Sequence, residues 1–371
     1  DGEPFEITCD WLYAGTGYYR YDQGYMPHFE GLADFEGEIV HPQHWPEDLD
    51  YTGKRVVVIG SGATAVTLVP ALADDGAGKV TMLQRSPTYV LPVPEKDALA
   101  NRLRKLIGDE RAYAITRRKN IFRQRAIYGL SKRFPKTVRR LIRKVNEKEL
   151  EGSGCDVDVH FKPKYDPWDQ RLCAVPNGDL YRAIRHGRAD VVTDTIDRFT
   201  ANGIRLASGR ELEADIIVTA TGLNLLPFGG IDISVDGEAV SLPDTVSYKG
   251  MMLSGVPNFL FAIGYTNSSW TLKVDLVCEY MCRLIDYTDR TGRDLAVAEV
   301  QDPKMELRPL LDFGAGYVMR SIDQLPKQGT EAPWFLTMNY RRDAKYLRES
   351  PVDDAGMRFA ARAREPEAVA V

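Results

Sequence analysis

A glycine-rich turn is the first stretch of this 371-residue sequence whose residue types and spacing could do chemistry. It follows the apolar run "VVVI" and consists of Gly60, Ser61, Gly62, Ala63 and Thr64, with Ala65 completing a G-x-G-x-x-A pattern. The first glycine permits a tight turn, the second lets backbone N–H groups approach a pyrophosphate, and the small last residue lets a helix pack closely on a strand. The pattern predicts a dinucleotide-binding turn, and the alternative is a tight strand-to-helix turn without a ligand.

The residues expected to choose the dinucleotide lie about 20 positions further on. Gln84, Arg85 and Ser86 stand where an NAD site needs a carboxylate to bind the ribose 2′-hydroxyl. A carboxylate would repel a 2′-phosphate, whereas Arg85 can bind one through two hydrogen bonds and Ser86 can donate another. We therefore predict NADP. The alternative for Arg85 is a surface arginine that merely ends the strand.

Two further strand ends look as if they lie against a dinucleotide. "TATGLN", residues 219–224, contains Thr221 and Gly222, and "AGTGYY", residues 14–19, resembles its counterpart. Two such ends suggest two dinucleotide-binding domains. The second glycine loop expected for FAD does not occur in these 371 residues, and the opening "DGEPFEITCDW" reads as cut from the middle of a sheet. We expect that an N-terminal segment precedes it.

The stretch "FEGEIVHPQHWP" carries the most specific signal. It matches F-x-G-x-x-x-H-x-x-x-W-P through Phe35, Gly37, His41, Trp45 and Pro46. Together with "GSGATA", "PWDQRLC" and "YKGMMLSGVPNF", it makes the sequence resemble the Baeyer-Villiger branch of the flavoprotein monooxygenases, and within that branch the ethionamide-activating type. The resemblance runs from residue 1 to about residue 345.

This resemblance implies an α/β, two-dinucleotide-binding-domain flavoprotein, with a Rossmann-like NADP domain carrying a helical insertion and part of a split FAD domain. We expect residues 1–34 to be a remnant of the first FAD-domain segment and 35–50 the fingerprint linker. Residues 51–222 would form the NADP domain, with a basic helical insertion at 97–160, and 223–371 the second FAD-domain segment and C-terminal tail. On residues alone His41 and His44 read as a loop pair. The resemblance implies that His41 and Trp45 couple cofactor binding to domain motion.

The resemblance also implies the catalytic residue. Arg171 corresponds to an arginine that stands over the flavin and stabilises an anionic flavin peroxide, while Gln170 replaces a lysine that contacts NADP. A fixed guanidinium suits an anion that develops in a dry pocket. Asn267 and Trp270 would lie where a helix start faces the flavin ring. An ion-paired Arg171 and plain helix capping are the alternatives.

The implied activity is an NADPH- and FAD-dependent monooxygenation through a C4a-peroxyflavin. O2 and a small molecule would be the partners, with oxygen inserted into a ketone or added to the sulfur of a sulfide or thioamide, or to a nitrogen group. One alternative is a truncated, non-catalytic NADP-binding fragment. Another is a flavin-dependent reductase, against which the absence of a C-x-x-C pair argues.

Several elements must position these residues. We predict a strand at 54–59, a helix after the glycine turn, and a second strand from Lys79, which together make a β-α-β unit. A buried strand is expected at 216–220 and a helix at about 270–286. Residues 97–150 are densely basic and helix-forming, with one apolar face formed by Val138, Leu141, Ile142 and Val145. That basic region could be a solvated surface, could attract an anionic cofactor, or could contact a membrane.

Composition excludes several classes. A hydrophobic fraction of 44%, a charged fraction of 27% and a net charge of −5 are typical of a soluble globular protein with no nucleic-acid partner. No apolar run reaches the ~20 residues of a membrane span, so we expect a cytoplasmic protein. The five cysteines predict reduced thiols and no metal site, with Cys278 and Cys282 buried on an apolar helix face.

Overall fold

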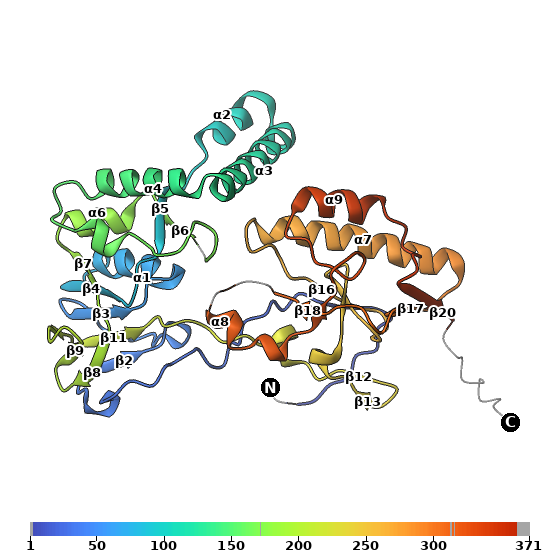
Figure 1. Ribbon diagram of the computed structural model, residues 1–371, viewed down its shortest axis with the longest axis horizontal. Coiled ribbons are helices and arrows are strands. Elements are labelled where there is room, and N and C mark those ends of the chain that lie inside the picture. Colours follow the sequence, from blue (N-terminus) through green and yellow to red (C-terminus); the bar gives the residue numbers. More distant parts are fainter. Residues whose placement is uncertain (1–2, 171, 312–313, 315, 362–371) are drawn as a thin grey trace. The chain divides into compact units, whose positions relative to one another are not determined.

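The computed structural model describes residues 3–170, 172–311, 314 and 316–361, and the chain divides into two compact units (Figure 1). Unit 1 contains residues 1–20 and 224–371, and unit 2 contains residues 21–223. The chain therefore passes between the units near residues 20 and 224. Residues 35–50, which we expected to form a linker, lie inside unit 2.

Unit 2 is built on a five-stranded parallel sheet in the order β2-β11-β3-β4-β7. Its strands are β2 (Glu38–Val40), β3 (Arg55–Ile59), β4 (Lys79–Gln84), β7 (Ala189–Thr193) and β11 (Ile216–Thr219). Their apolar runs are buried because both faces of the sheet are covered. Helices α1 (Ala63–Asp74) and α6 (Asp179–Arg185) share a core with one face, and the antiparallel strands β8 (Ile196–Thr200), β9 (Gly203–Leu206) and β10 (Glu211–Glu213) share a core with the other. The predicted β-α-β unit and buried strand are confirmed.

The basic region of unit 2 is helical, as predicted. It contains α2 (Ala98–Ile107), α3 (Asp109–Arg133), α4 (Pro135–Glu149) and α5 (Val157–His160), and it is flanked by the parallel pair β5 (Tyr89–Val93) and β6 (Leu172–Pro176). Helix α4 contacts α6 through a hydrogen bond, in which the Tyr181 hydroxyl of α6 donates to the Asn146 side chain of α4 over 2.8 Å. The predicted apolar face of α4 is partly wrong. Ile142 is buried, but Leu141 is 57% exposed and Asn146 takes the inward position.

Unit 1 contains a four-stranded sheet in the order β1-β16-β15-β14, covered by helices. The helices are α7 (Trp270–Thr291), α8 (Gly316–Met319) and α9 (Tyr340–Glu349), and the sheet strands are β1 (Leu12–Ala14), β14 (Ser247–Tyr248), β15 (Met252–Leu253) and β16 (Phe259–Phe261). Two-stranded pairs complete the unit: β12 (Ser234–Val235) with β13 (Glu238–Ala239), β17 (Leu295–Ala298) with β20 (Met357–Ala360), and β18 (Arg308–Pro309) with β19 (Lys327–Gln328). In Figure 1, α9 lies beside α7. Short 3-10 turns occur in both units: η1 (Leu32–Asp34), η2 (Pro42–His44), η3 (Pro227–Gly230), η4 (Leu242–Asp244) and η5 (Ile322–Gln324).

Helix α7 confirms the predicted helix but corrects the prediction for its cysteines. Its inward face is formed by Leu272, Leu276, Val277, Tyr280 and Leu284. Cys278 and Cys282 are both exposed. They are four residues apart and so share a face, as predicted, but that face points away from the core.

Candidate cofactor-binding site

The carboxyl edge of the parallel sheet in unit 2 gathers most of the predicted site residues. From β3 the chain continues to β4 and β7 on one side, and later returns through β11 on the other side of β3. Ligands of open α/β sheets bind at such a topological switch point. The fingerprint residues His41, Trp45 and Pro46 follow β2, and residues 220–222 follow β11. The glycine turn follows β3, and Arg85 follows β4.

Glycine is needed at positions 60 and 62 of the turn for different physical reasons. Gly60 has φ +135°, and a Cβ placed there would lie 2.3 Å from the carbonyl oxygen of Ala220, so the turn needs glycine for its own geometry. Gly62 is the N-cap residue of α1 with ordinary backbone angles, and a Cβ there would meet no atom within 4 Å. The glycine at 62 therefore keeps open the space in front of the helix, which a pyrophosphate would need.

The start of α1 suits an anion. Gly62, Ala63 and Thr64 are exposed, and the first turn of the helix contains no acidic residue. No side chain of the described residues caps this helix. The unsatisfied N–H groups and the helix dipole therefore favour a negative charge there. The Ser61 hydroxyl lies 2.9 Å from that of Thr88, which ties the turn to the loop after β4. Ala65 is fully buried, as close packing of helix on sheet requires.

The three residues at the end of β4 divide into two kinds. Gln84 is 2% exposed, and its side-chain amide donates to the His160 carbonyl and the Thr193 hydroxyl, each over 2.8 Å. Gln84 therefore links the end of β4 to His160 and to Thr193 at the end of β7, and its side chain is not available to a ligand. Arg85 and Ser86 are exposed, and Arg85 makes no ion pair among the residues that the structure describes. That arrangement leaves a guanidinium available for a phosphate.

The fingerprint histidines His41 and His44 hold residues 22–24 against the sheet edge. His41 is the N-cap residue of η2, and its Nδ1 accepts from the Gln43 N–H over 3.2 Å. Its ring lies against Gly24, where a Cβ would come within 1.9 Å of it. The His44 ring nitrogen lies 3.1 Å from the Asp22 carbonyl. The sequence predicts only an ordinary loop position for His44, but its ring helps to hold the same residues.

The next residue along the chain, Tyr25, is hydrogen-bonded to the loop after β11. The Tyr25 N–H donates to the Gly222 carbonyl over 3.0 Å, and the Thr221 hydroxyl donates to the Tyr25 carbonyl over 2.6 Å. His41 Nε2 is buried and has no hydrogen-bond partner within the described part of the chain. Burial lowers the pKa of His41 below its ordinary value of 6.5, although the nearby Gly222 backbone acts in the opposite direction. The ring is consequently neutral near pH 7.

The other fingerprint residues have packing roles. A Cβ at Gly37 would lie 2.5 Å from the Asp215 carbonyl oxygen, so glycine lets β2 approach the turn before β11. Phe35 is buried edge-on against Phe199, with ring centroids 6.4 Å apart. Trp45 packs edge-on against Tyr51, with ring centroids 6.1 Å apart, and both rings lie against the hydrophobic core that contains α1 and α6. Pro46 is partly exposed.

Arg171, the predicted catalytic residue, lies outside the described residues, and its neighbour Gln170 is exposed. The loop before Gln170 is held by Lys132, which pairs with Asp169 over 2.8 Å, and by Tyr89, whose hydroxyl donates to the Tyr165 carbonyl over 2.6 Å. This loop therefore has a defined anchorage on α3 and β5.

The predicted flavin-facing residues Asn267 and Trp270 belong to unit 1. Ser269 is the backbone N-cap of α7, but its hydroxyl bonds to that of Thr271 and caps no N–H group. Asn267 donates to the Met338 carbonyl over 2.9 Å, so it fastens the loop before α7 and does not cap the helix. Trp270 packs on Tyr18, with centroids 5.0 Å apart.

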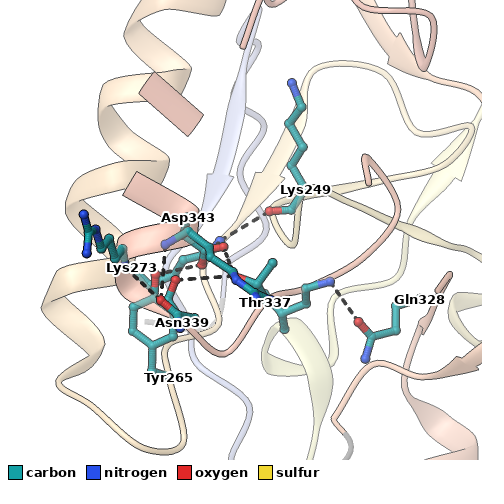
Figure 2. A network of polar contacts seen from close by, with 10 residues as sticks. Lys249, Tyr265, Lys273, Gln328, Thr337, Asn339 and Asp343 are labelled. Atoms are coloured by element: carbon teal, nitrogen blue, oxygen red, sulfur yellow. Dashed lines mark hydrogen bonds and ion pairs between the residues drawn. The ribbon is translucent and has the colours of Figure 1, made fainter. Parts of the chain in front are cut away.

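A buried charged network next to the start of α7 was not predicted from the sequence (Figure 2). Lys273 and Asp343 are 1% and 3% exposed, and Lys273 Nζ lies 3.1 Å from the Asp343 carboxylate. The same carboxylate accepts from the Tyr265 hydroxyl over 2.7 Å and from the Thr337 hydroxyl. Burial lowers the pKa of Lys273, while Asp343 acts against that shift. Lys273 lies in α7 itself, Tyr265 lies in the segment before α7, and Thr337 lies in the segment before α9.

A second buried lysine lies close to this network. Lys249 Nζ pairs with Asp354 over 2.9 Å and donates to the Tyr280 hydroxyl over 2.9 Å. The rings of Tyr248, Tyr280 and Tyr346 surround it at 4.6 to 5.2 Å. The Lys249 carbonyl in turn accepts from Lys273 over 3.4 Å. Nothing in the sequence "YKGMM" indicates that its lysine is buried.

Within the described residues no group of three or more His, Cys, Asp or Glu could hold a metal ion. Among the same residues, no helix has both the length and the apolar composition to cross a membrane.

Comparison with known proteins gives concordant results. A family model described as flavin-binding monooxygenase-like matches residues 6–243. The chain is 56% identical over 356 residues to the FAD-containing monooxygenase EthA of Mycobacterium tuberculosis, covering 96% of this chain and 73% of that protein. It is 50% identical over 360 residues to a probable FAD-binding monooxygenase AlmA of Acinetobacter, covering 96% and 72%.

Solved structures show the same architecture. The chain matches OTEMO in complex with FAD and NADP with a TM-score of 0.66, at 20% identity over 95% of this chain and 76% of that one. It matches cyclohexanone monooxygenase with a TM-score of 0.67, at 20% identity over 95% and 74%. The α/β fold is thus that of Baeyer-Villiger monooxygenase structures. The chain belongs to the flavin-binding monooxygenase-like family, and the resemblance stated from the sequence is confirmed.

Proposed function

We propose that this protein is an NADPH- and FAD-dependent monooxygenase that transfers one atom of O2 to a small organic substrate. In the balanced reaction, NADPH, a proton, O2 and the substrate give NADP⁺, water and the oxygenated product. The observation that carries the NADPH part of the proposal is the sheet edge of unit 2. There, among the described residues, the start of α1 has no side-chain cap and Arg85 has no ion-pair partner, and the space at Gly62 is open, which together suit a phosphorylated dinucleotide.

The residues of unit 2 fit NADP by chemistry as well as by position. The N–H groups of residues 62–64 would bind the pyrophosphate, and Arg85 and Ser86 would bind the 2′-phosphate. The neutral Gln170 would approach the same nucleotide. His41 supports a coupling role for the fingerprint, since its ring contacts Gly24 and lies by Gly222, the two segments that border the sheet edge.

The flavin would be held by unit 1. The first turn of α7 has N–H groups that no side chain caps within the described part of the chain, and these would favour the charge that a reduced flavin ring gains. When bound, FAD supplies the activation of O2, and NADPH supplies the electrons. We propose that Arg171 contributes the fixed positive charge beside the reacting oxygen.

The proposed substrates are ketones, which would become esters, and sulfides, thioamides or nitrogen compounds, which would gain an oxygen on the heteroatom. Measuring NADPH oxidised, O2 consumed and product formed under ¹⁸O2 tests the reaction. One labelled oxygen atom per NADPH is expected in the product. NADPH oxidation that yields only hydrogen peroxide with every substrate class would contradict the proposal.

Replacing Arg171 with Ala tests its role. Product formation should be lost while NADPH still binds with unchanged affinity in a fluorescence titration. Undiminished product formation would show that Arg171 takes no part in the reaction.

The alternative of a non-catalytic NADP-binding fragment predicts no flavin absorption from the protein after incubation with FAD and gel filtration.

A further inference from the structure

The hairpin formed by α2 and α3 has almost no core of its own. No residue of α2 is buried, and the buried residues of α3 are Ala112 and Ser131. Large apolar side chains are exposed along both helices and at the residue that follows them: Leu99, Leu106, Ile107, Tyr113, Ile115, Phe122, Ile127, Leu130 and Phe134. Leu106 is 72% exposed and Phe122 74%. Scattered single residues of this kind are ordinary, but a concentration on one hairpin marks an interaction surface.

Basic residues accompany these apolar side chains in a regular order. Arg111, Arg118 and Arg125 are spaced seven apart, so they lie along one line of α3. Ile115 and Phe122 each follow one of these arginines by four residues and form the adjacent line. The three arginines are exposed, and within the described residues none of them is in an ion pair.

The hairpin is also strongly charged relative to the whole protein. Residues 98–133 contain eleven Lys or Arg and two acidic residues, whereas the whole chain has a net charge of −5. Such a local positive charge attracts an anionic surface. A helix with exposed apolar side chains beside a row of arginines is typical of interfacial helices, which lie in the boundary of a bilayer with anionic lipids.

We propose that the α2–α3 hairpin docks onto an anionic lipid bilayer, with Leu106 and Phe122 entering the boundary of the acyl chains and Arg111, Arg118 and Arg125 contacting the phosphate headgroups. This surface goes beyond the monooxygenase reaction and does not depend on it. A nucleic acid would also attract the arginines, but it gives no reason for exposed Leu106 and Phe122. A second copy of this chain would cover the apolar residues while bringing two positively charged hairpins together.

Vesicle co-sedimentation of the full chain tests the proposal. Binding is expected to mixed phosphatidylcholine–phosphatidylglycerol vesicles, with little binding to phosphatidylcholine alone, and it should weaken as salt is added. The double variant Leu106→Ser/Phe122→Ser and the double variant Arg118→Glu/Arg125→Glu should each weaken binding by about tenfold or more. The controls are Phe5→Ser, an exposed aromatic in unit 1, and Arg341→Glu/Arg342→Glu, two exposed arginines of α9; both should bind like the parent.

Folding and assembly are followed in the same samples. Each variant should keep the parent melting temperature and NADPH affinity, because the altered side chains are exposed and lie outside the sheet edge. Light scattering without vesicles should give the same molar mass for the parent and for Leu106→Ser/Phe122→Ser. A mass that falls in that variant would assign the surface to a second copy and overturn the proposal.

The remaining outcomes are equally decisive. No binding to anionic vesicles would overturn the proposal. Binding that depends on the arginines but not on Leu106 and Phe122, and that duplex DNA abolishes by competition, would replace the bilayer with a general polyanion. Binding that neither double variant changes would place the lipid contact elsewhere on the chain.

Discussion

Two cations of this protein, Arg85 and Lys273, illustrate two different uses of positive charge. Lys273 is almost fully buried, and a carboxylate that accepts two further hydrogen bonds neutralises it. Arg85 is exposed at the sheet edge of unit 2 and has no ion-pair partner among the described residues. Since a buried charge must be paired to be tolerated, Lys273 belongs to the structure of unit 1, whereas Arg85 is available for a ligand.

The same contrast applies to the two helix starts. The N-cap residue of α9 is Asn339, whose side chain accepts from the N–H groups of Arg341 and Arg342. The N-cap residue of α1 is Gly62, and no side chain of the described residues caps its N–H groups. A helix start that the protein caps itself is structural. A start left open by a glycine is suited to bind an anion, here beside an arginine that pairs with no described residue.

The largest expected effect comes from breaking the buried pair. Asp343→Ala leaves Lys273 buried without its partner, and it should lower the free energy of unfolding by about 3 to 5 kcal/mol, measured by urea denaturation. The double variant Lys273→Met/Asp343→Leu removes both charges and should lose less than Asp343→Ala alone. Asp232→Ala, at an exposed acid of unit 1, is the control. Equal losses in the single and double variants would mean that the charge pair is not what stabilises this region.

The two glycines of the nucleotide turn should separate stability from binding. Gly60→Ala forces a Cβ against Ala220 at a positive φ, so it should cost about 2 kcal/mol or more of stability and lower NADPH affinity as well. Gly62→Ala meets no protein atom, so the melting temperature should be unchanged while NADPH binds more weakly. Thermal unfolding and fluorescence titration of both variants check this. Unchanged NADPH affinity in Gly62→Ala would place the pyrophosphate elsewhere.

Removing the guanidinium at 85 should change selectivity. Arg85→Ala is expected to lose about 2 kcal/mol of NADPH binding, or roughly thirtyfold in affinity, because a charge-assisted contact to the 2′-phosphate is gone. Binding of NADH should not change. Arg102→Ala, an exposed arginine of α2, serves as the control for general electrostatic attraction. A similar loss for both nucleotides would indicate attraction without selective contact.

The smallest effect is a pH dependence that arises from His41. Its folded pKa lies below 6.5, so as the pH falls below that value the unfolded chain takes up a proton that the buried ring resists. Stability should therefore decrease from pH 6.5 downwards, and it should be fully present above it. His41→Gln should reduce this slope of melting temperature against pH. Burial also lowers the pKa of His160, which contributes to the same slope, so His160→Gln is the matched comparison.

Sequence patterns predicted those parts of the fold that depend on interactions between residues close together in the chain. The apolar run 56–59, the turn glycines and the helix after them predicted the β-α-β unit correctly, because strand burial, turn geometry and helix start all act within about 30 residues. The position of Arg85 at a strand end followed from the same unit. Gln84, in contrast, turned out to bond with His160 and Thr193, which lie 76 and 109 residues away.

Long-range pairing could not be predicted from the sequence. Lys273 lies in an amphipathic helix, where a lysine is normally solvated, and its partner Asp343 is 70 residues further along the chain. The cysteines of α7 were placed wrongly because the spacing of four gave a common face but not which face. The fingerprint was identified by resemblance, yet its contacts with Asp22 and Gly24 follow only from the folded chain.

The measurement that tests the central claim most directly is a parallel titration of the full chain with NADPH and NADH under identical salt and pH. NADPH should bind at least about tenfold more tightly, and that preference should disappear in Arg85→Ala. Equal affinities of the parent protein for the two nucleotides would contradict the assignment of the sheet edge as an NADP site.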